Sequence, residues 1–120
     1  MATAIDRAEI LGRLSGDREL IAEVVDLFVA DRATLLDDLR RAVSNNDARA
    51  ARDAAHRLKG VLATLAARGA LSTTIKLEEL ARMGDLRAAP ATLDTLEREV
   101  EVVQDELAML VKDLASSPTP

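Results

Sequence analysis

The sequence predicts an all-α protein, an antiparallel up-down four-helix bundle with a short additional helix at its N-terminus. Three observations predict this fold. Apolar residues make up 48% of the 120 residues but aromatic residues only 1%, so the core must be built from Leu, Val, Ile and Ala, which favours helices over sheets. Along the long segments, apolar residues recur at steps of three and four, as a buried helical stripe requires. The loops are short, so consecutive helices should lie antiparallel.

The first two helices are predicted on either side of a turn at residues 15–17. The first helix is short and covers residues 6–14. The second covers about residues 18–43, and the side chain of Asp17 can cap its first turn. Its apolar positions are expected to form one buried stripe, made of Leu20, Val24, Leu27, Phe28, Leu35, Leu36, Leu39 and Val43.

Three more helices are predicted in the rest of the chain. The third covers about residues 48–67, and Gly69 is expected to end it. The fourth covers about residues 70–83 and is closed by Gly84. Pro90 suits an early turn of the last helix. That helix carries a seam of alternating steps of three and four, which should pack at a shallow angle on its neighbours: Leu93, Leu96, Val100, Val103, Leu107, Leu110 and Leu114.

Length and composition limit the kind of protein. We expect one domain over residues 1–115 and a flexible tail over residues 116–120. A net charge of −5 gives no reason to expect a nucleic acid or an anionic membrane as partner. The absence of cysteine excludes disulfides and thiolate metal sites. Because we find neither an apolar run of about 20 residues nor a signal peptide, we expect a cytoplasmic protein.

The chain has a single histidine, His56, within the third predicted helix. Residues three, four and seven apart share one face of a helix, and this face of the His56 helix carries Lys59, Gly60 and Ala63. The buried seam passes through the preceding residue, Ala55, so the His56 stripe is turned about 100° away from it. We therefore expect the imidazole on the flank of the bundle, where a partner can reach it.

The small and charged residues beside His56 indicate a site for phosphoryl chemistry. Glycine inside a helix costs about 1 kcal/mol relative to alanine, so Gly60 indicates that something must approach the backbone closely. The alternative is a packing contact between helices within the bundle. Lys59 can balance the negative charge of a phosphoryl group, and it favours a neutral, nucleophilic imidazole. As a solvated lysine, it should be replaceable with little effect on folding.

The sign of the charge changes along the chain. Residues 40–60 carry six basic and two acidic side chains, a balance of +4, whereas residues 91–114 carry two basic and seven acidic ones, a balance of −5. The side that bears His56 should therefore attract an acidic or a phosphorylated partner. Arg49 and Arg52 are candidate partner-binding residues there, although such arginines are more often solvated charges than dedicated contacts.

The segment Ala55-His56-Arg57-Leu58-Lys59-Gly60 resembles the A-H-x-L-K-G signature of histidine-containing phosphotransfer (HPt) domains. Further similarity lies upstream, from Phe28 to the polar turn at Asp47, and downstream, from Gly69 to Asp85, so that it extends over about residues 5–113. Two positions depart from the family pattern. Val61 replaces a small polar residue that often follows the glycine, and Ala66 replaces a further glycine. Both departures bear on which partner binds.

The resemblance implies a helical bundle that carries a phosphoryl group on His56 between receiver-domain aspartates, or from a hybrid histidine kinase to a response regulator. In this reading the chain is a phosphoryl carrier and not an enzyme. By analogy with the family, Lys59 steadies the phosphoryl charge, and Gly60 and Ala63 let the receiver approach. The chain itself would bind no cofactor and no metal, the magnesium ion would belong to the receiver, and the protein is expected to be a monomer.

Two other readings of the sequence remain open. The chain could be a non-catalytic helical adaptor in which the histidine is incidental, with the seam of the last helix serving for dimerisation. It could also be the histidine-bearing domain of a larger kinase. No nucleotide-binding motif is present, so phosphorylation directly from ATP is not expected.

Overall fold

Five helices and no strand make up the part of the chain that the computed structural model describes, residues 4–116. The helices are α1 (Arg7–Arg13), α2 (Arg18–Ser44), α3 (Ala48–Thr64), α4 (Arg68–Arg82) and α5 (Ala89–Ser116). The predicted all-α class is therefore confirmed, and so is the short helix that precedes four longer ones.

Aspartate side chains begin the first three helices. Asp6, Asp17 and Asp47 precede α1, α2 and α3, and each carboxylate accepts a hydrogen bond from the backbone N–H three residues later. Such a cap satisfies one of the N–H groups that the first turn of a helix leaves without a partner, and it contributes about 1 kcal/mol. The start of each of these three helices is thus specified by a residue directly before it in the sequence.

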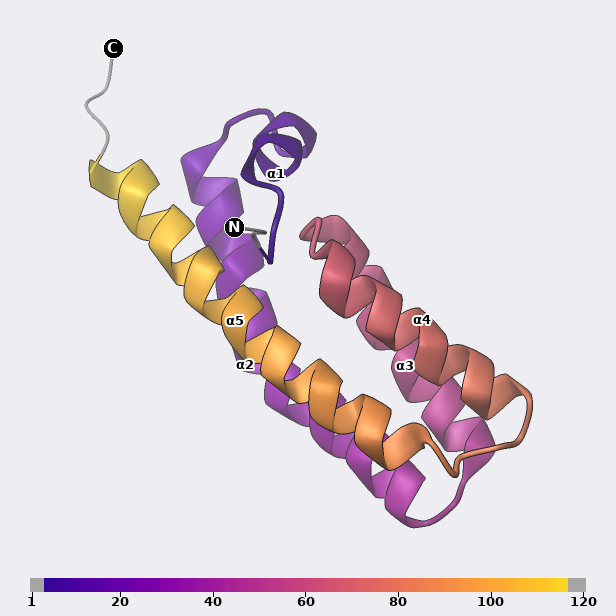
Figure 1. The fold of residues 1–120 in the computed structure, drawn as a ribbon. Helices are drawn as coiled ribbons and strands as arrows, with labels where there is room; N and C mark the ends of the chain where they lie inside the picture. Colours follow the sequence, from indigo (N-terminus) through magenta and orange to yellow (C-terminus); the bar gives the residue numbers. More distant parts are fainter. Residues whose placement is uncertain (1–3, 117–120) are drawn as a thin grey trace.

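The four long helices form the antiparallel bundle shown in Figure 1. Each of them packs against two others: α3 lies against α2 and α4, and α5 lies against the same two. Because α2 and α5 are longer than α3 and α4, they extend beyond them at one end, and α1 lies across that end (Figure 1). Ile5 and Ile10, each at most 2% exposed, anchor α1 and the segment before it in the core.

The buried stripe of α2 differs from the predicted one. The structure buries Ile21, Val25, Phe28, Leu36, Leu39 and Ala42. Leu20 and Leu27, which we had placed on the buried stripe, are 39% and 63% exposed. Phe28, Leu36 and Leu39 are buried as predicted. The prediction is wrong for Leu20 and Leu27 because α2 is rich in apolar residues on more than one side, so spacing alone does not determine which side faces the core.

The connection between α3 and α4 lies earlier in the chain than predicted. The third helix ends at Thr64, and Gly69 lies inside α4 instead of ending α3. The chain reverses at Ala66, which has a φ of +52° and so takes the left-handed conformation expected of a glycine at a helix end. That conformation costs a residue with a side chain about 1–2 kcal/mol. This explains why a glycine is favoured where this chain has Ala66.

The seam of α5 is used inside the bundle. Its members from Leu93 to Leu110 are at most 4% exposed, so they are not available to hold a second copy of the chain. The helix continues through Ser116, which we had placed in the tail. Residues 117–120, the rest of the predicted tail, lie outside the described residues.

Candidate functional site

His56 lies on the outer face of α3, and 70% of its side chain is exposed. The residue before it, Ala55, is fully buried, as are Leu58 and Leu62 further along the helix. The angular offset predicted from the sequence is therefore present, and the imidazole projects from the flank of the bundle. A group on another molecule can reach the ring.

A buried carboxylate on α4 lies within hydrogen-bond distance of the His56 imidazole. The Nδ1 atom of His56 lies 2.8 Å from Oε2 of Glu78, whose side chain is only 6% exposed. The other oxygen of the carboxylate, Oε1, accepts a hydrogen bond of 2.7 Å from Nζ of Lys59. Glu78 thus joins His56 and Lys59, which share one face of α3, and it fixes both to the neighbouring helix.

The charge state of Glu78 determines which nitrogen of His56 is protonated. The hydrogen bond from Lys59 is the main cause that lowers the pKa of the Glu78 carboxyl, and the contact with His56 also lowers it, although burial acts in the opposite direction. The carboxylate is therefore ionised at neutral pH and can only accept hydrogen bonds. It follows that Nδ1 of His56 donates, and that Nε2 of a neutral ring carries its lone pair towards solvent.

Lys59 is half-buried, with 30% of its side chain exposed. One of the three N–H donors of its ammonium group points to Glu78, which leaves donors for an anion placed on the imidazole. A second cation, Arg82, reaches the same carboxylate oxygen at 3.7 Å and forms a 3.0 Å ion pair with Glu79. The buried negative charge is thus surrounded by positive groups.

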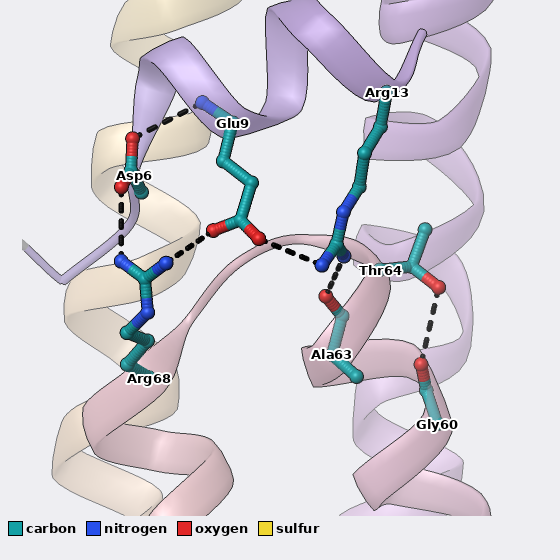
Figure 2. Close-up of polar contacts among 7 residues, drawn as sticks. All are labelled: Asp6, Glu9, Arg13, Gly60, Ala63, Thr64 and Arg68. Atoms are coloured by element: carbon teal, nitrogen blue, oxygen red, sulfur yellow. Dashed lines mark hydrogen bonds and ion pairs between the residues drawn. The ribbon is translucent and has the colours of Figure 1, made fainter.

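Gly60 faces open space. A Cβ atom built on it would meet no atom within 4 Å, other than those of its own and adjoining residues and of its own helix backbone. The alternative that this glycine serves packing inside the bundle is therefore wrong. One turn further, the half-buried Ala63 completes the stripe. The hydroxyl of Thr64 donates a hydrogen bond to the Gly60 carbonyl, as Figure 2 shows.

The basic residues near His56 are partly neutralised by acids. Arg57 lies 3.4 Å from Asp38 of α2. Arg52 makes only a long contact of 3.7 Å with its neighbour Asp53. Arg49 is exposed and forms no ion pair with any residue between 4 and 116. The two predicted partner-binding arginines therefore lie on the His56 stripe, one and two turns before the histidine, with their charges largely free.

An apolar hollow adjoins the same face between α2 and α3. Its walls are Val24, Leu27, Phe28 and Asp31 on α2 and Val61, Thr64 and Leu65 at the end of α3. Leu27, for which the sequence predicts a core position, is 63% exposed and lines this hollow. The departure of Val61 from the family pattern also lies here, where it adds apolar surface to the hollow.

Glu78 is the site residue that sequence reasoning did not single out. A signal for it exists, because the buried residues of α4 are Ala70, Thr74, Leu77, Glu78 and Ala81. A glutamate in the middle of such a stripe requires a cation or a hydrogen-bond donor beside it. The spacing does not say which helix supplies that partner, and so the link to His56 had to come from the packing.

The described part of the chain, residues 4–116, contains neither a metal-binding cluster nor a membrane-spanning helix. Nowhere in that range do three histidine, cysteine, aspartate or glutamate side chains gather in a way that could hold a metal ion. Among the helices of the same range, none has the length and apolar character needed to cross a bilayer.

Comparisons with known proteins agree with this geometry. The sequence matches the Hpt domain family over residues 23–110. The fold is similar to the crystal structure of histidine-containing phosphotransfer protein B from Pseudomonas aeruginosa PAO1, with a TM-score of 0.87 and 28% sequence identity over 94% of this chain and 98% of that one. The comparison with curated proteins gave no match.

Proposed function

The chain belongs to the Hpt domain family, whose members are carriers in histidine phosphotransfer through two-component phosphorelays, and we propose that His56 is the residue on which this chain carries the phosphoryl group. The observation that carries the proposal is the exposed imidazole with its Nδ1 atom 2.8 Å from a buried carboxylate. That arrangement places the proton on Nδ1, so the lone pair of Nε2 in the neutral ring faces outward, which is the form that a nucleophilic histidine needs.

The transfer step follows from this orientation. The lone pair of Nε2 attacks the phosphorus of an aspartyl phosphate on a receiver domain, a P–N bond forms, and the P–O bond to the aspartate breaks. The aspartate leaves as a carboxylate. Nδ1 keeps its proton, and Glu78 stabilises the positive charge that the ring gains when Nε2 is phosphorylated. The reverse sequence returns the group to an aspartate.

Charge at the site favours a bound phosphoryl group. Lys59 keeps donors free while it is bonded to Glu78, so it can hydrogen-bond a phosphoryl oxygen without abandoning the buried carboxylate. Arg49 and Arg52 add positive potential along the same stripe and draw an acidic receiver towards it. Phosphoryl transfer depends mainly on positioning and charge neutralisation, which these residues supply.

The docking face is the surface around Gly60. With no side chain at this position, a receiver can come close to α3 one turn from the imidazole. The apolar hollow at Leu27 and Val61 lies beside it and gives an apolar side chain of the receiver a place to bury. In this proposal the chain acts as a monomeric carrier, and the receiver brings the magnesium ion and the remaining catalytic groups.

The direct experiment mixes the protein with a panel of phosphorylated receiver domains and magnesium. Phosphate that is labile to acid and stable to base should appear on the protein, and mass spectrometry should place it on His56. The His56→Gln variant is the control, because it keeps a side chain that can hydrogen-bond Glu78 but offers no nucleophile. If the wild type remains unlabelled with every receiver, or the variant labels equally, the proposal is wrong.

A further inference from the structure

The helix α1 lies outside the segment that matches the family, which begins at residue 23. Even so, it is fixed to the end of the His56 helix. Arg13, at the last position of α1, donates a hydrogen bond to the carbonyl of Ala63 on α3 (Figure 2). Ala63 is on the His56 stripe, so the guanidinium of Arg13 stands where that stripe ends, about 10 Å along the helix axis from the histidine.

A network of charged groups holds α1 in this place. Arg68, in the first turn of α4, forms ion pairs of 2.9 Å with Asp6 and 2.6 Å with Glu9, and Glu9 also pairs with Arg13 at 2.7 Å (Figure 2). The backbone N–H of Asp6 donates to the carbonyl of Ala66, over 3.1 Å. The C-terminal turn of α1 is therefore positioned before any partner arrives, so ordering it costs little on binding.

That turn is also accessible. The side chain of Arg13 is 47% exposed, and the glycine before it, Gly12, has open space where a side chain would lie. The apolar hollow beside Gly60 ends at Thr64 and Leu65, in the same last turns of α3 that Arg13 reaches. The surface around Gly60 and the end of α1 are thus continuous.

We propose that the C-terminal turn of α1 contacts the docked receiver domain and that Arg13 selects among receivers by pairing with an acidic side chain on the preferred ones. This inference rests on the proposed function. A charge at the rim of an interface affects the choice of partner and the rate of association more than the chemistry at the centre. Arg13 is accordingly a specificity-determining residue and has no part in the attack by Nε2.

The test compares Arg13→Ala with Arg7→Ala. Arg7 is a matched control, because it is an arginine of similar exposure on the same helix but pairs with Asp113 of α5, at 2.8 Å, instead of with α3. The kcat/KM for phosphotransfer is measured from each receiver of a panel, and labelling by phosphoramidate, which needs no receiver, reports the chemistry at His56 separately.

We expect Arg13→Ala to lower kcat/KM about threefold to tenfold for the preferred receivers and less than about twofold for the others. Arg13→Lys should retain most of the preference, and Arg7→Ala all of it. The inference is overturned if Arg13→Ala changes kcat/KM by the same factor for every receiver, or changes it for none. It is also overturned if the variant slows phosphoramidate labelling as much as it slows transfer from the preferred receivers. Failure of the proposed function looks different, because then no receiver labels even the wild type.

Discussion

The Nδ1 atom of His56 and the Oε2 atom of Glu78 lie 2.8 Å apart, although the imidazole is 70% exposed and the carboxylate only 6%. A surface nucleophile is thus oriented by a group that solvent and partner cannot reach. Because Glu78 also holds Lys59, the ring and the cation have a fixed relation to one another.

Glu78→Ala should slow phosphotransfer by about tenfold to a hundredfold, by analogy with the loss of the group that orients a metal-bound imidazole. Glu78→Gln should slow phosphotransfer less, because its amide oxygen can still accept a hydrogen bond from Nδ1 of His56. Glu79→Ala, a change to an exposed neighbour, is the control. Nitrogen NMR of His56 gives a readout independent of activity: the wild type should hold its proton on Nδ1, and the alanine variant should hold a mixture of tautomers. Equal transfer rates in Glu78→Ala and the wild type would refute the positioning role.

Lys59→Ala should destabilise the fold as well as slow transfer, which departs from the expectation for a solvated lysine. Its removal leaves the nearly buried Glu78 without its closest cation, and that costs on the order of 1–3 kcal/mol in the free energy of unfolding. Lys76→Ala, a change to an exposed lysine on α4, should alter stability by less than about 0.5 kcal/mol. In urea unfolding, the double variant Lys59→Ala/Glu78→Gln should recover part of the loss, and no recovery would count against the pair.

The same carboxylate predicts a loss of stability in acid. The folded-state pKa of Glu78 is lowered below its ordinary value of 4.5, so the unfolded chain binds a proton more readily there. The stabilisation is fully present above the unfolded pKa and is lost as the pH falls through the folded one. Urea unfolding from pH 7 to pH 3 should show a difference between the wild type and Glu78→Gln that is constant above about pH 5 and shrinks below it. A constant difference throughout would mean that Glu78 does not titrate as proposed.

Substitutions at Gly60 should separate folding from docking. Gly60→Ala should raise the free energy of unfolding by about 1 kcal/mol, because α3 gains a better helix former and the methyl group meets open space. Gly60→Leu should fold but lose transfer from receivers, while labelling by phosphoramidate continues. Ala91→Leu, at an exposed position of α5, serves as the control for added apolar bulk. Undiminished transfer to Gly60→Leu would show that no partner approaches the backbone there.

Leu27→Ser tests the apolar hollow. Because this side chain is 63% exposed, its loss should change stability by less than about 0.5 kcal/mol. Burial of a leucine at an interface is worth about 1.5–3 kcal/mol, so receiver affinity should fall roughly tenfold or more. Val29→Ser, at a 41% exposed position of the same helix outside the hollow, should leave affinity unchanged. Binding isotherms that respond equally to both variants would place the docking face elsewhere.

The local sequence was sufficient to predict the helices and the residues that share the outer face of α3 with His56. Helical spacing alone placed Lys59 and Gly60 beside His56, because neighbours on one helix are fixed by its pitch. Aspartate caps and glycine-containing turns placed most of the helix boundaries within a few residues. The α3–α4 turn was misjudged, since Ala66 adopts a conformation that sequence rules reserve for glycine.

Tertiary structure decided which residues of other helices contact or adjoin the His56 stripe. Glu78 is 22 residues from His56 in sequence, and only the packing of α4 against α3 brings its carboxylate under the ring. Packing also decided that Leu27 faces outward, and that Arg13 reaches the end of α3. The sequence by itself determined the helices and the reactive face, because both depend on contacts within a few turns. The orientation of the ring and the shape of the docking surface depend on contacts between helices, which periodicity does not specify.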